Sequence, residues 1–348
     1  LEFRRVLFRS NMHPLMKPQK LRPGDTIATI SLSGGRAGDP DMIERYTFGK
    51  QQLKEHFGLH VVETPNSLKG KAYLYNNPRC RAEDLNWALT NPRIKGIFVN
   101  SGGDDGARLL PYLDVNRIRS NPKILLGYSD VSVFHMMFTY AGVSSFYGAN
   151  VLSSIAQPDG LDTYTEKWIR KVLFSGSCIG EVEPEDKRAE IQWDKTKKSE
   201  WVTNTGYELL QGKGRVTGRL LGGCCGSMQQ IMGTEIFPDK ELWKDSILFM
   251  DIGTPYGVET ATLHQLRAFA AAGIFKYARG LLCTGMNDSD KDILIKVIRY
   301  EEGLTDLPVL YNLAIGHRIP MTVIPTGALA EIDCDHTTFS ILEAGVKE

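Results

Sequence analysis

The chain has 348 residues, which exceeds one typical hydrophobic core and predicts two domains. Its 41 basic and 41 acidic side chains leave no net charge, so the composition favours neither nucleic acid nor an anionic membrane as a partner. Six cysteines without paired spacing argue against a zinc site and a dense disulfide framework, and no apolar run reaches the roughly eighteen residues of a membrane span. We therefore expect a soluble, cytoplasmic protein.

The first ten residues, LEFRRVLFRS, lack an initiator methionine, a long apolar region and a small-residue cleavage site. They do not make a secretory signal. We interpret residues 1–15 as a non-native N-terminal scar and tail, and expect the native start at Met12 or Met16.

Residues 16–175 alternate short apolar runs with longer segments of helical period. This alternation predicts a parallel sheet with helices on its faces, and therefore a flavodoxin-like α/β domain. Ligands of such sheets bind at the carboxyl ends of the strands. The expected strand and helix pairs are 25–31 with 42–58, 95–103 with 107–114, 123–129 with 131–142, and 143–150 with 162–175.

The alternation is lost between residues 176 and 214, where the polar run 185–206 has no apolar period. We expect an interdomain linker here that carries a long loop. Residues 215–348 predict a smaller C-terminal domain of mixed β and α structure. Its expected elements are strands and turns in 212–223, strands at 246–251 and 279–285, a helix at 261–273, and further strands and turns over 308–333.

Ser129 stands at the join between the expected strand 123–129 and the expected helix 131–142. A serine on such a turn has its hydroxyl lifted into solvent and the next backbone N–H aimed at the group under attack, as in a nucleophile elbow. Gly127 relieves crowding in the turn, whereas Val131 stands where the strict pattern has a second glycine. The alternative is that Ser129 or Asp130 only caps the helix.

A serine nucleophile needs a base, usually histidine, and the base needs an orienting carboxylate. Of the seven histidines, His135 and His264 lie in expected helices, and we interpret them as packed or solvated. His317 follows Gly316 at the end of an apolar run, where a loop can present it. The alternative for His317 is an ordinary surface residue.

Seven short pieces of the sequence occur in an order that resembles one known family. A Gly-Gly pair precedes GYSD by about 25 residues, a strand ends in a carboxylate, and a late Gly-His is followed by Pro and then by Pro-x-Gly. The pieces read CRAEDLNWAL, SGGDDGARLL, KILLGYSD, RLLGG, ILFMD, IGHRIP and IPTG. Together, from about Lys20 to Asp333, they resemble the serine peptidase family of LD-carboxypeptidases and microcin C immunity proteins.

The resemblance implies a serine peptidase or amidase with its active site in the cleft between the two domains and without metal or other cofactor. Ser129 matches the nucleophile, His317 the general base and Asp251 the third member of the triad. The family usually carries glutamate in place of Asp251. Because aspartate is shorter by one C–C bond, roughly 1.5 Å, contact with His317 could be lost or bridged by water.

Attack on an amide also needs two donors for the oxyanion. The N–H of Asp130 is one by elbow geometry, and the resemblance suggests that the N–H of Gly103 or of Asp104 is the second. The pair Asp104-Asp105 is a second departure, since many family members carry an aromatic residue or glycine there.

Two further motifs indicate weaker alternatives. Gly34, Gly35 and Gly38 follow the first expected strand but do not give the GxGxxG spacing of a dinucleotide site, so we expect no nucleotide cofactor. Cys224-Cys225 could form a vicinal disulfide or supply a thiol nucleophile. Without an evident base, we interpret both as buried structural cysteines.

The family has two substrate classes: murein peptides with an L,D bond to a terminal D-amino acid, and peptide–nucleotide conjugates resembling microcin C. The chain length and the segment 201–214 favour the microcin-immunity branch, with Trp201 and Tyr207 stacking on a nucleobase or, alternatively, packing at the domain boundary. We expect a homodimer without a nucleic-acid or membrane partner. The rival hypothesis is a catalytically weak or inactive module that binds a ligand in the same cleft.

Overall fold

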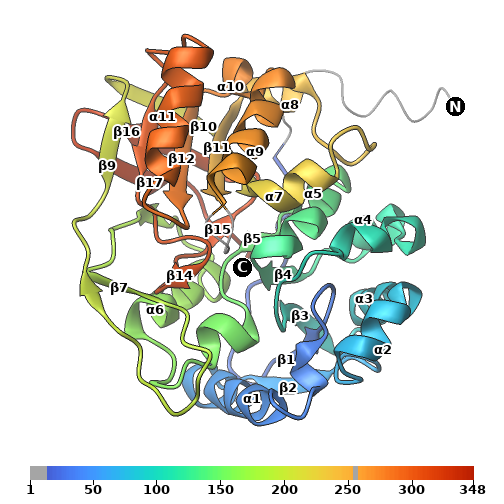
Figure 1. Ribbon diagram of the computed structural model, residues 1–348. Coiled ribbons are helices and arrows are strands. Elements are labelled where there is room, and N and C mark those ends of the chain that lie inside the picture. The colour runs from blue at the N-terminus through green and yellow to red at the C-terminus, as the bar shows by residue number, and fades with distance from the viewer. Residues whose placement is uncertain (1–13, 254–257) are drawn as a thin grey trace, which may run out of the picture.

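The computed structural model describes residues 14–253 and 258–348. Figure 1 shows two main sheets in separate halves of the molecule, with helices packed around each. Of the segment 1–15, interpreted above as non-native, residues 1–13 lie outside the described residues. Within the described ranges, no helix is long and apolar enough to cross a membrane.

The first sheet has six strands in the order β15-β5-β4-β3-β1-β2. Strands β1 to β5 run parallel in the order 2-1-3-4-5, which is the flavodoxin-like order, so the expected α/β fold is confirmed. The sixth strand, β15, comes from the C-terminal part of the chain and pairs antiparallel with β5. The strands are β1 Thr26–Ile30, β2 His60–Glu63, β3 Ile94–Val99, β4 Ile124–Gly127, β5 Phe146–Tyr147 and β15 Ile324–Pro325.

The helices of this half mostly follow the expected 3.6-residue period. The exception is the segment expected as a helix at 107–114, which is a 3-10 helix with Pro111 inside it. Proline lacks the N–H that an α-helix would use there. The helices are α1 Ile43–Phe57, α2 Lys71–Asn76, α3 Pro78–Thr90, α4 Val115–Ser120, α5 Ser132–Tyr140, α6 Thr163–Leu173, the 3-10 helices η1 Arg36–Gly38, η2 Gly106–Tyr112 and η3 Ser129–Val131, and the π-helix η4 Val151–Ile155.

The second sheet has eight strands in the order β6-β17-β16-β10-β11-β12-β13-β9. Its four central strands, β10 to β13, run parallel, and antiparallel strands complete both edges. The strands are β6 Gly180–Glu181, β9 Glu208–Gln211, β10 Arg215–Cys224, β11 Ser246–Ile252, β12 Gly280–Gly285, β13 Val309–Tyr311, β16 Leu329–Asp333 and β17 Thr338–Ile341. The helices are α7 Cys225–Gln230, α8 Lys240–Lys244, α9 Glu259–Ala271, α10 Ile274–Tyr277, α11 Asp290–Ile295 and the π-helix η5 Lys296–Glu301.

The segment 176–214, expected as a linker, contains four short strands. Two of them, β6 and β9, form the two edges of the eight-stranded sheet. The other two, β7 (Lys187–Glu190) and β8 (Val202–Thr203), join β14 (Arg318–Ile319) in a three-stranded sheet. In Figure 1 this yellow-green segment runs along one side of the molecule, from the half that contains α1 to the half that contains β9. It therefore contributes structure beside His317 as well as connecting the two halves.

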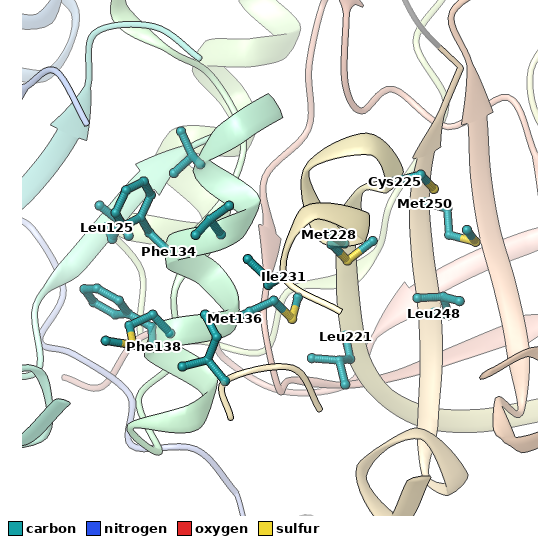
Figure 2. Packing of buried hydrophobic residues seen from close by; sticks show 14 of the residues in the cluster. Leu125, Phe134, Met136, Phe138, Leu221, Cys225, Met228, Ile231, Leu248 and Met250 are labelled. Atoms are coloured by element: carbon teal, nitrogen blue, oxygen red, sulfur yellow. The ribbon is translucent and has the colours of Figure 1, made fainter. Parts of the chain in front are cut away.

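One apolar cluster extends through both halves. Figure 2 shows Phe134, Met136 and Phe138 of α5 on one side, and Met228 and Ile231 from α7 and its C-terminal end on the other. Residues 132–139 of α5 are all buried, because the helix lies between the first sheet and the elements of the second. The helix that begins beside Ser129 is thus fixed against the half that carries His317.

Candidate active site

Ser129 occupies the sharp turn between β4 and α5. Its φ of 66° lies in the left-handed region, which residues other than glycine rarely adopt, as expected for a nucleophile elbow. A Cβ on Gly127 would lie 2.9 Å from Asn150 Oδ1 and 3.0 Å from side-chain atoms of Val131 and Val99, so little room is left for a side chain before the turn. The hydroxyl of Ser132 donates to the Ser129 carbonyl at 2.7 Å and accepts the N–H of Cys224 in β10 at 2.8 Å, which ties the elbow to the second sheet.

The structure brings Ser129, His317 and Asp251 together. The Oγ of Ser129 lies 3.0 Å from Nε2 of His317, and Nδ1 of the same ring lies 2.8 Å from Oδ2 of Asp251. The three side chains come from the end of β4, the loop after β13 and the end of β11. With Nδ1–H donating to the carboxylate, Nε2 is free to accept the serine proton, which is the tautomer a general base requires.

The short side chain of Asp251 reaches the imidazole because the loop that carries Gly316 and His317 lies close to the Asp251 carboxylate. Gly316 has φ 85°, and a Cβ there would lie 2.3 Å from Cγ of Asp251. Only a glycine allows this approach of the backbone to the carboxylate. Of the alternatives that the shorter side chain left open, the structure shows direct contact between Asp251 and His317, neither lost nor bridged by water.

A buried polar network holds the Gly-Gly turn beside the elbow. Arg81 of α3 makes two parallel 2.8 Å hydrogen bonds to Asp105, and Ser33 donates to Asp130 at 2.5 Å. Although burial alone would raise it, the hydrogen bonds and charges of Arg81 and Arg108 hold the pKa of Asp105 below its usual value. Asp105, noted above as a departure from the family pattern, thus anchors the turn.

The Asp130 side chain is fully buried beside the elbow. Burial raises the pKa of this carboxyl, and hydrogen bonds from Ser33 and from the Gly106 N–H partly offset that rise. The Asp130 nitrogen lies 3.4 Å from where a Cβ on Gly102 would be. Of the turn residues, Gly102 is therefore the one that packs against the elbow, while Gly103 faces Ser33 and Asp104 is exposed.

Two models of protein families match the chain. The LD-carboxypeptidase N-terminal domain matches residues 27–148, and the LD-carboxypeptidase C-terminal domain matches residues 217–332. The chain belongs to the LD-carboxypeptidase family. The family predicted from the order of the sequence motifs is thereby confirmed.

Members of the LD-carboxypeptidase family align with this chain over almost its whole length. The microcin C7 self-immunity protein MccF of Escherichia coli is 28% identical over 95% of this chain and 96% of that protein. A probable murein peptide carboxypeptidase of Bacillus subtilis is 27% identical over 95% of this chain and 96% of that protein. The solved structure of an MccF-like protein from Streptococcus pneumoniae, in complex with AMP, has 29% identity, covers 91% of this chain and 98% of that chain, and superposes with a TM-score of 0.83.

A pocket of about 640 Å³ opens beside His317, a size typical of ligand sites. Both halves and the segment 176–214 contribute to it. Its aromatic walls are Tyr128 and Trp193, and the Trp193 ring faces the guanidinium of Arg45 at 4.9 Å. The remaining lining residues are Glu190, Ile191, Met286, Asn287, Asp288, His317 and Arg318.

Trp201 and Tyr207, the two residues expected to contact substrate, do not line this pocket. Lys187 lies over the Trp201 ring at 4.7 Å, and the Tyr207 hydroxyl donates to the Val182 carbonyl at 2.8 Å. Burial raises the pKa of Tyr207 well above its usual value. Tyr207 contacts the residue that follows β6, at an edge of the eight-stranded sheet, and the tryptophan that lines the pocket beside His317 is Trp193. Both tryptophans lie in the same aperiodic stretch, so no sequence signal distinguishes them.

Cys224 and Cys225 are free, buried thiols. Burial, followed by the charge of Asp251, raises the pKa of Cys224 to about 12, so this thiol stays protonated near neutral pH. The same is true of Cys225, whose pKa burial raises well above its usual value. In the part of the chain that the structure describes, no group of three or more His, Cys, Asp or Glu side chains is placed to hold a metal ion.

Proposed function

We propose that this protein is a serine peptidase or amidase of the LD-carboxypeptidase type that hydrolyses an amide in a small peptide or peptide–nucleotide conjugate. One observation carries the proposal: a continuous hydrogen-bonded series from Ser129 through His317 to Asp251, with distances of 3.0 and 2.8 Å. A serine on a strained elbow has little structural reason to contact a loop histidine that a buried carboxylate orients.

The reaction proceeds through an acyl-enzyme. The Oγ of Ser129 attacks the scissile carbonyl carbon while its proton passes to Nε2 of His317, and Asp251 stabilises the resulting imidazolium. His317 then protonates the amine as the C–N bond breaks. Water attacks the acyl carbon, gives its proton to His317, and the ester bond to Ser129 breaks as that proton returns to Oγ.

We assign the oxyanion donors to the N–H groups of Asp130 and Gly103. The Gly102 carbonyl accepts the N–H of Gly34 at 2.9 Å. In a planar trans peptide the O and H lie on opposite sides, so the N–H of Gly103 is turned away from Gly34. Gly102 itself packs on Ser129, which supports placing the Gly103 donor beside the reacting centre. Asp104 remains the other candidate.

The substrate we favour is a peptide–nucleotide conjugate rather than a murein peptide. The relatives include a microcin C7 self-immunity protein and an MccF-like protein solved with AMP. Trp193 lines the pocket beside His317 and is 43% exposed, so its indole offers an aromatic surface of the kind on which a flat base stacks. We also propose a cytoplasmic homodimer, which light scattering of the purified protein would test.

The test is to incubate the purified protein with a murein L,D-tetrapeptide and with an aminoacyl-sulfamoyl-adenosine, and to follow each by mass spectrometry. We expect loss of the aminoacyl group from the second substrate, and no cleavage by the Ser129→Ala variant. Binding of either compound without cleavage by the wild type would favour the rival hypothesis, an inactive binding module. Cleavage of the tetrapeptide alone would reverse the substrate preference and keep the reaction type.

A further inference from the structure

Tyr147 is a buried residue of the first sheet that contacts both the triad acid and the nucleophile's backbone. It lies in β5 beside Gly127 of β4, so it stands next to the start of the elbow. Its hydroxyl donates to Oδ2 of Asp251 at 3.1 Å and accepts the backbone N–H of Ser129 at 3.4 Å. The side chain is fully buried. This one hydroxyl therefore connects two triad members that come from different sheets.

The Asp251 carboxylate depends on this contact for its orientation. Oδ2 accepts both hydrogen bonds, from His317 and from Tyr147, whereas Oδ1 has no partner among the described residues. Of these two donors, His317 stands on a loop and is the group to be oriented. Tyr147 stands in a sheet, and its ring packs against Phe249 at 5.4 Å between centroids. Tyr147 is therefore the donor whose own position is fixed by packing, and its hydrogen bond orients the Asp251 carboxylate.

The hydroxyl is a permanent donor. Burial, followed by the charge of Asp251, raises the pKa of Tyr147 well above its usual value of 10. The phenol thus stays protonated at every pH at which the protein would work. The hydroxyl donates a hydrogen bond to Asp251, and its oxygen accepts a hydrogen bond from the N–H of Ser129.

We propose that Tyr147 is a positioning residue that holds the short Asp251 side chain in contact with His317 and aligns it with the Ser129 elbow. It acts through Asp251 and touches no reacting atom. The inference deepens the proposed function and rests on it, because it assigns Tyr147 a part in the same triad.

The test uses Tyr147→Phe with Tyr46→Phe as the matched control. Tyr46 is also buried, and its hydroxyl also contacts two side chains, Thr29 at 2.7 Å and Glu63 at 3.0 Å, outside the active site. Each variant reacts with a fluorophosphonate probe over a range of pH, followed by intact mass. In this reaction Oγ of Ser129 displaces fluoride from phosphorus and its proton passes to His317, so no amide substrate is needed.

We expect Tyr147→Phe to react roughly 10- to 100-fold more slowly than wild type, because a misplaced acid no longer orients the base. The acidic limb of its pH–rate profile should move to lower pH, because a displaced Asp251 carboxylate stabilises the imidazolium less. The low-field NMR signal of the His317 Nδ1–H should shift or disappear. Tyr46→Phe should match wild type in all three measurements.

The proposal is overturned if Tyr147→Phe matches Tyr46→Phe in rate, pH profile and NMR signal. It is also overturned if the acidic limb moves to higher pH without loss of rate, which would mean that Tyr147 only competes with His317 for Asp251. A wild-type protein that reacts with the probe but cleaves neither amide substrate would refute the proposed amidase function. The role of Tyr147 would still be decided by the probe reaction and the NMR signal. If the wild type does not react with the probe, the NMR signal alone decides.

Discussion

Gly102 lies directly against the side chain of Ser129. A Cβ at position 102 would stand 2.7 Å from Cβ and 2.8 Å from Oγ of Ser129, closer than real Cβ atoms approach their neighbours. The carbonyl of the same glycine is engaged with Gly34. The turn that we propose as part of the oxyanion site thus has no room for a side chain.

Gly102→Ala should therefore lower turnover by roughly 10²- to 10³-fold, the loss typical of a displaced oxyanion donor, while the fold is kept. Gly226→Ala is the control, because the nearest atom to its added Cβ is the end of the flexible Gln265 side chain, at 3.1 Å. Both variants are compared with wild type in kcat and in melting temperature. Wild-type turnover in Gly102→Ala would show that the turn does not approach the reacting centre.

Ser129→Ala should abolish turnover and leave the melting temperature close to that of wild type. The Ser129 hydroxyl is hydrogen-bonded to Nε2 of His317, and the His317 side chain is only half-buried. Removing the hydroxyl therefore removes little packing in the hydrophobic core. Mass spectrometry of the reaction and circular dichroism of the variant check both parts. If the variant turns over normally, another nucleophile must be sought.

His317→Ala should lower kcat by roughly three or more orders of magnitude, as expected when one member of a triad is lost. His336→Ala is the matched control, because His336 also pairs with an aspartate, Asp333, but its side chain is 71% exposed near the C-terminus. The pH dependence of kcat/KM gives a second check. A wild-type profile without a titration near neutral pH would exclude His317 as the base.

His135 should make the fold less stable in acid. Its ring nitrogens lie 2.9 Å from Ser145 Oγ and from the Gly127 carbonyl, and burial lowers its pKa from 6.5 to about 4. Between these values the unfolded chain binds a proton that the folded chain does not. The free energy of unfolding should therefore fall as pH drops from 6.5 to 4, by up to about 3 kcal/mol from this residue. Urea unfolding over this range, with NMR titration of the ring, measures it.

Glu185 should change the pH dependence of the free energy of unfolding in the direction opposite to His135, and it provides the control for that measurement. Burial raises its pKa from 4.5 to about 7, so between these values the folded chain keeps a proton that the unfolded chain has lost. Its contribution to stability is present below pH 4.5 and is lost as pH rises towards 7. In Glu185→Gln the loss of stability on acidification from pH 6.5 to 4.5 should be steeper than in wild type. An unchanged slope would mean that Glu185 is charged in the folded chain.

The parts of the fold that follow local patterns could be predicted from the sequence. Strand and helix periods predicted the parallel sheet, and the order of short motifs led to Ser129, His317 and Asp251. Strands β6 and β9, and the pairing of β15 with the first sheet, could not be predicted in this way, because each strand is two to four residues long and is stabilised by partners far away in the chain.

The contacts that complete the site are also non-local. Tyr147 and Asp251 are 104 residues apart and belong to different sheets, so no spacing in the sequence indicates their hydrogen bond. Arg81 was part of a recognised motif, but its pairing with Asp105 depends on how α3 packs beside the Gly-Gly turn. The reach of Asp251 depends on a loop conformation at Gly316 that composition does not specify.

Asp251→Glu should lower turnover, although glutamate is usual in the family. The carboxylate already lies 2.8 Å from Nδ1 of His317, and the backbone of Gly316 fills the space in front of it. One more methylene would push the carboxylate roughly 1.5 Å into the imidazole or the loop. Displacement of that size predicts a loss of roughly 10- to 100-fold in kcat.

Asp251→Asn separates charge from size at the same position. Its amide has the shape of the carboxylate but does not stabilise an imidazolium, and it favours the wrong tautomer of His317, so kcat should fall further, by roughly 10³- to 10⁴-fold. The order wild type, then Glu, then Asn in kcat is the expected result, with similar KM values throughout. A rise in turnover on Asp251→Glu would show that the observed 2.8 Å contact is not the productive one and that the strand and loop rearrange during the reaction.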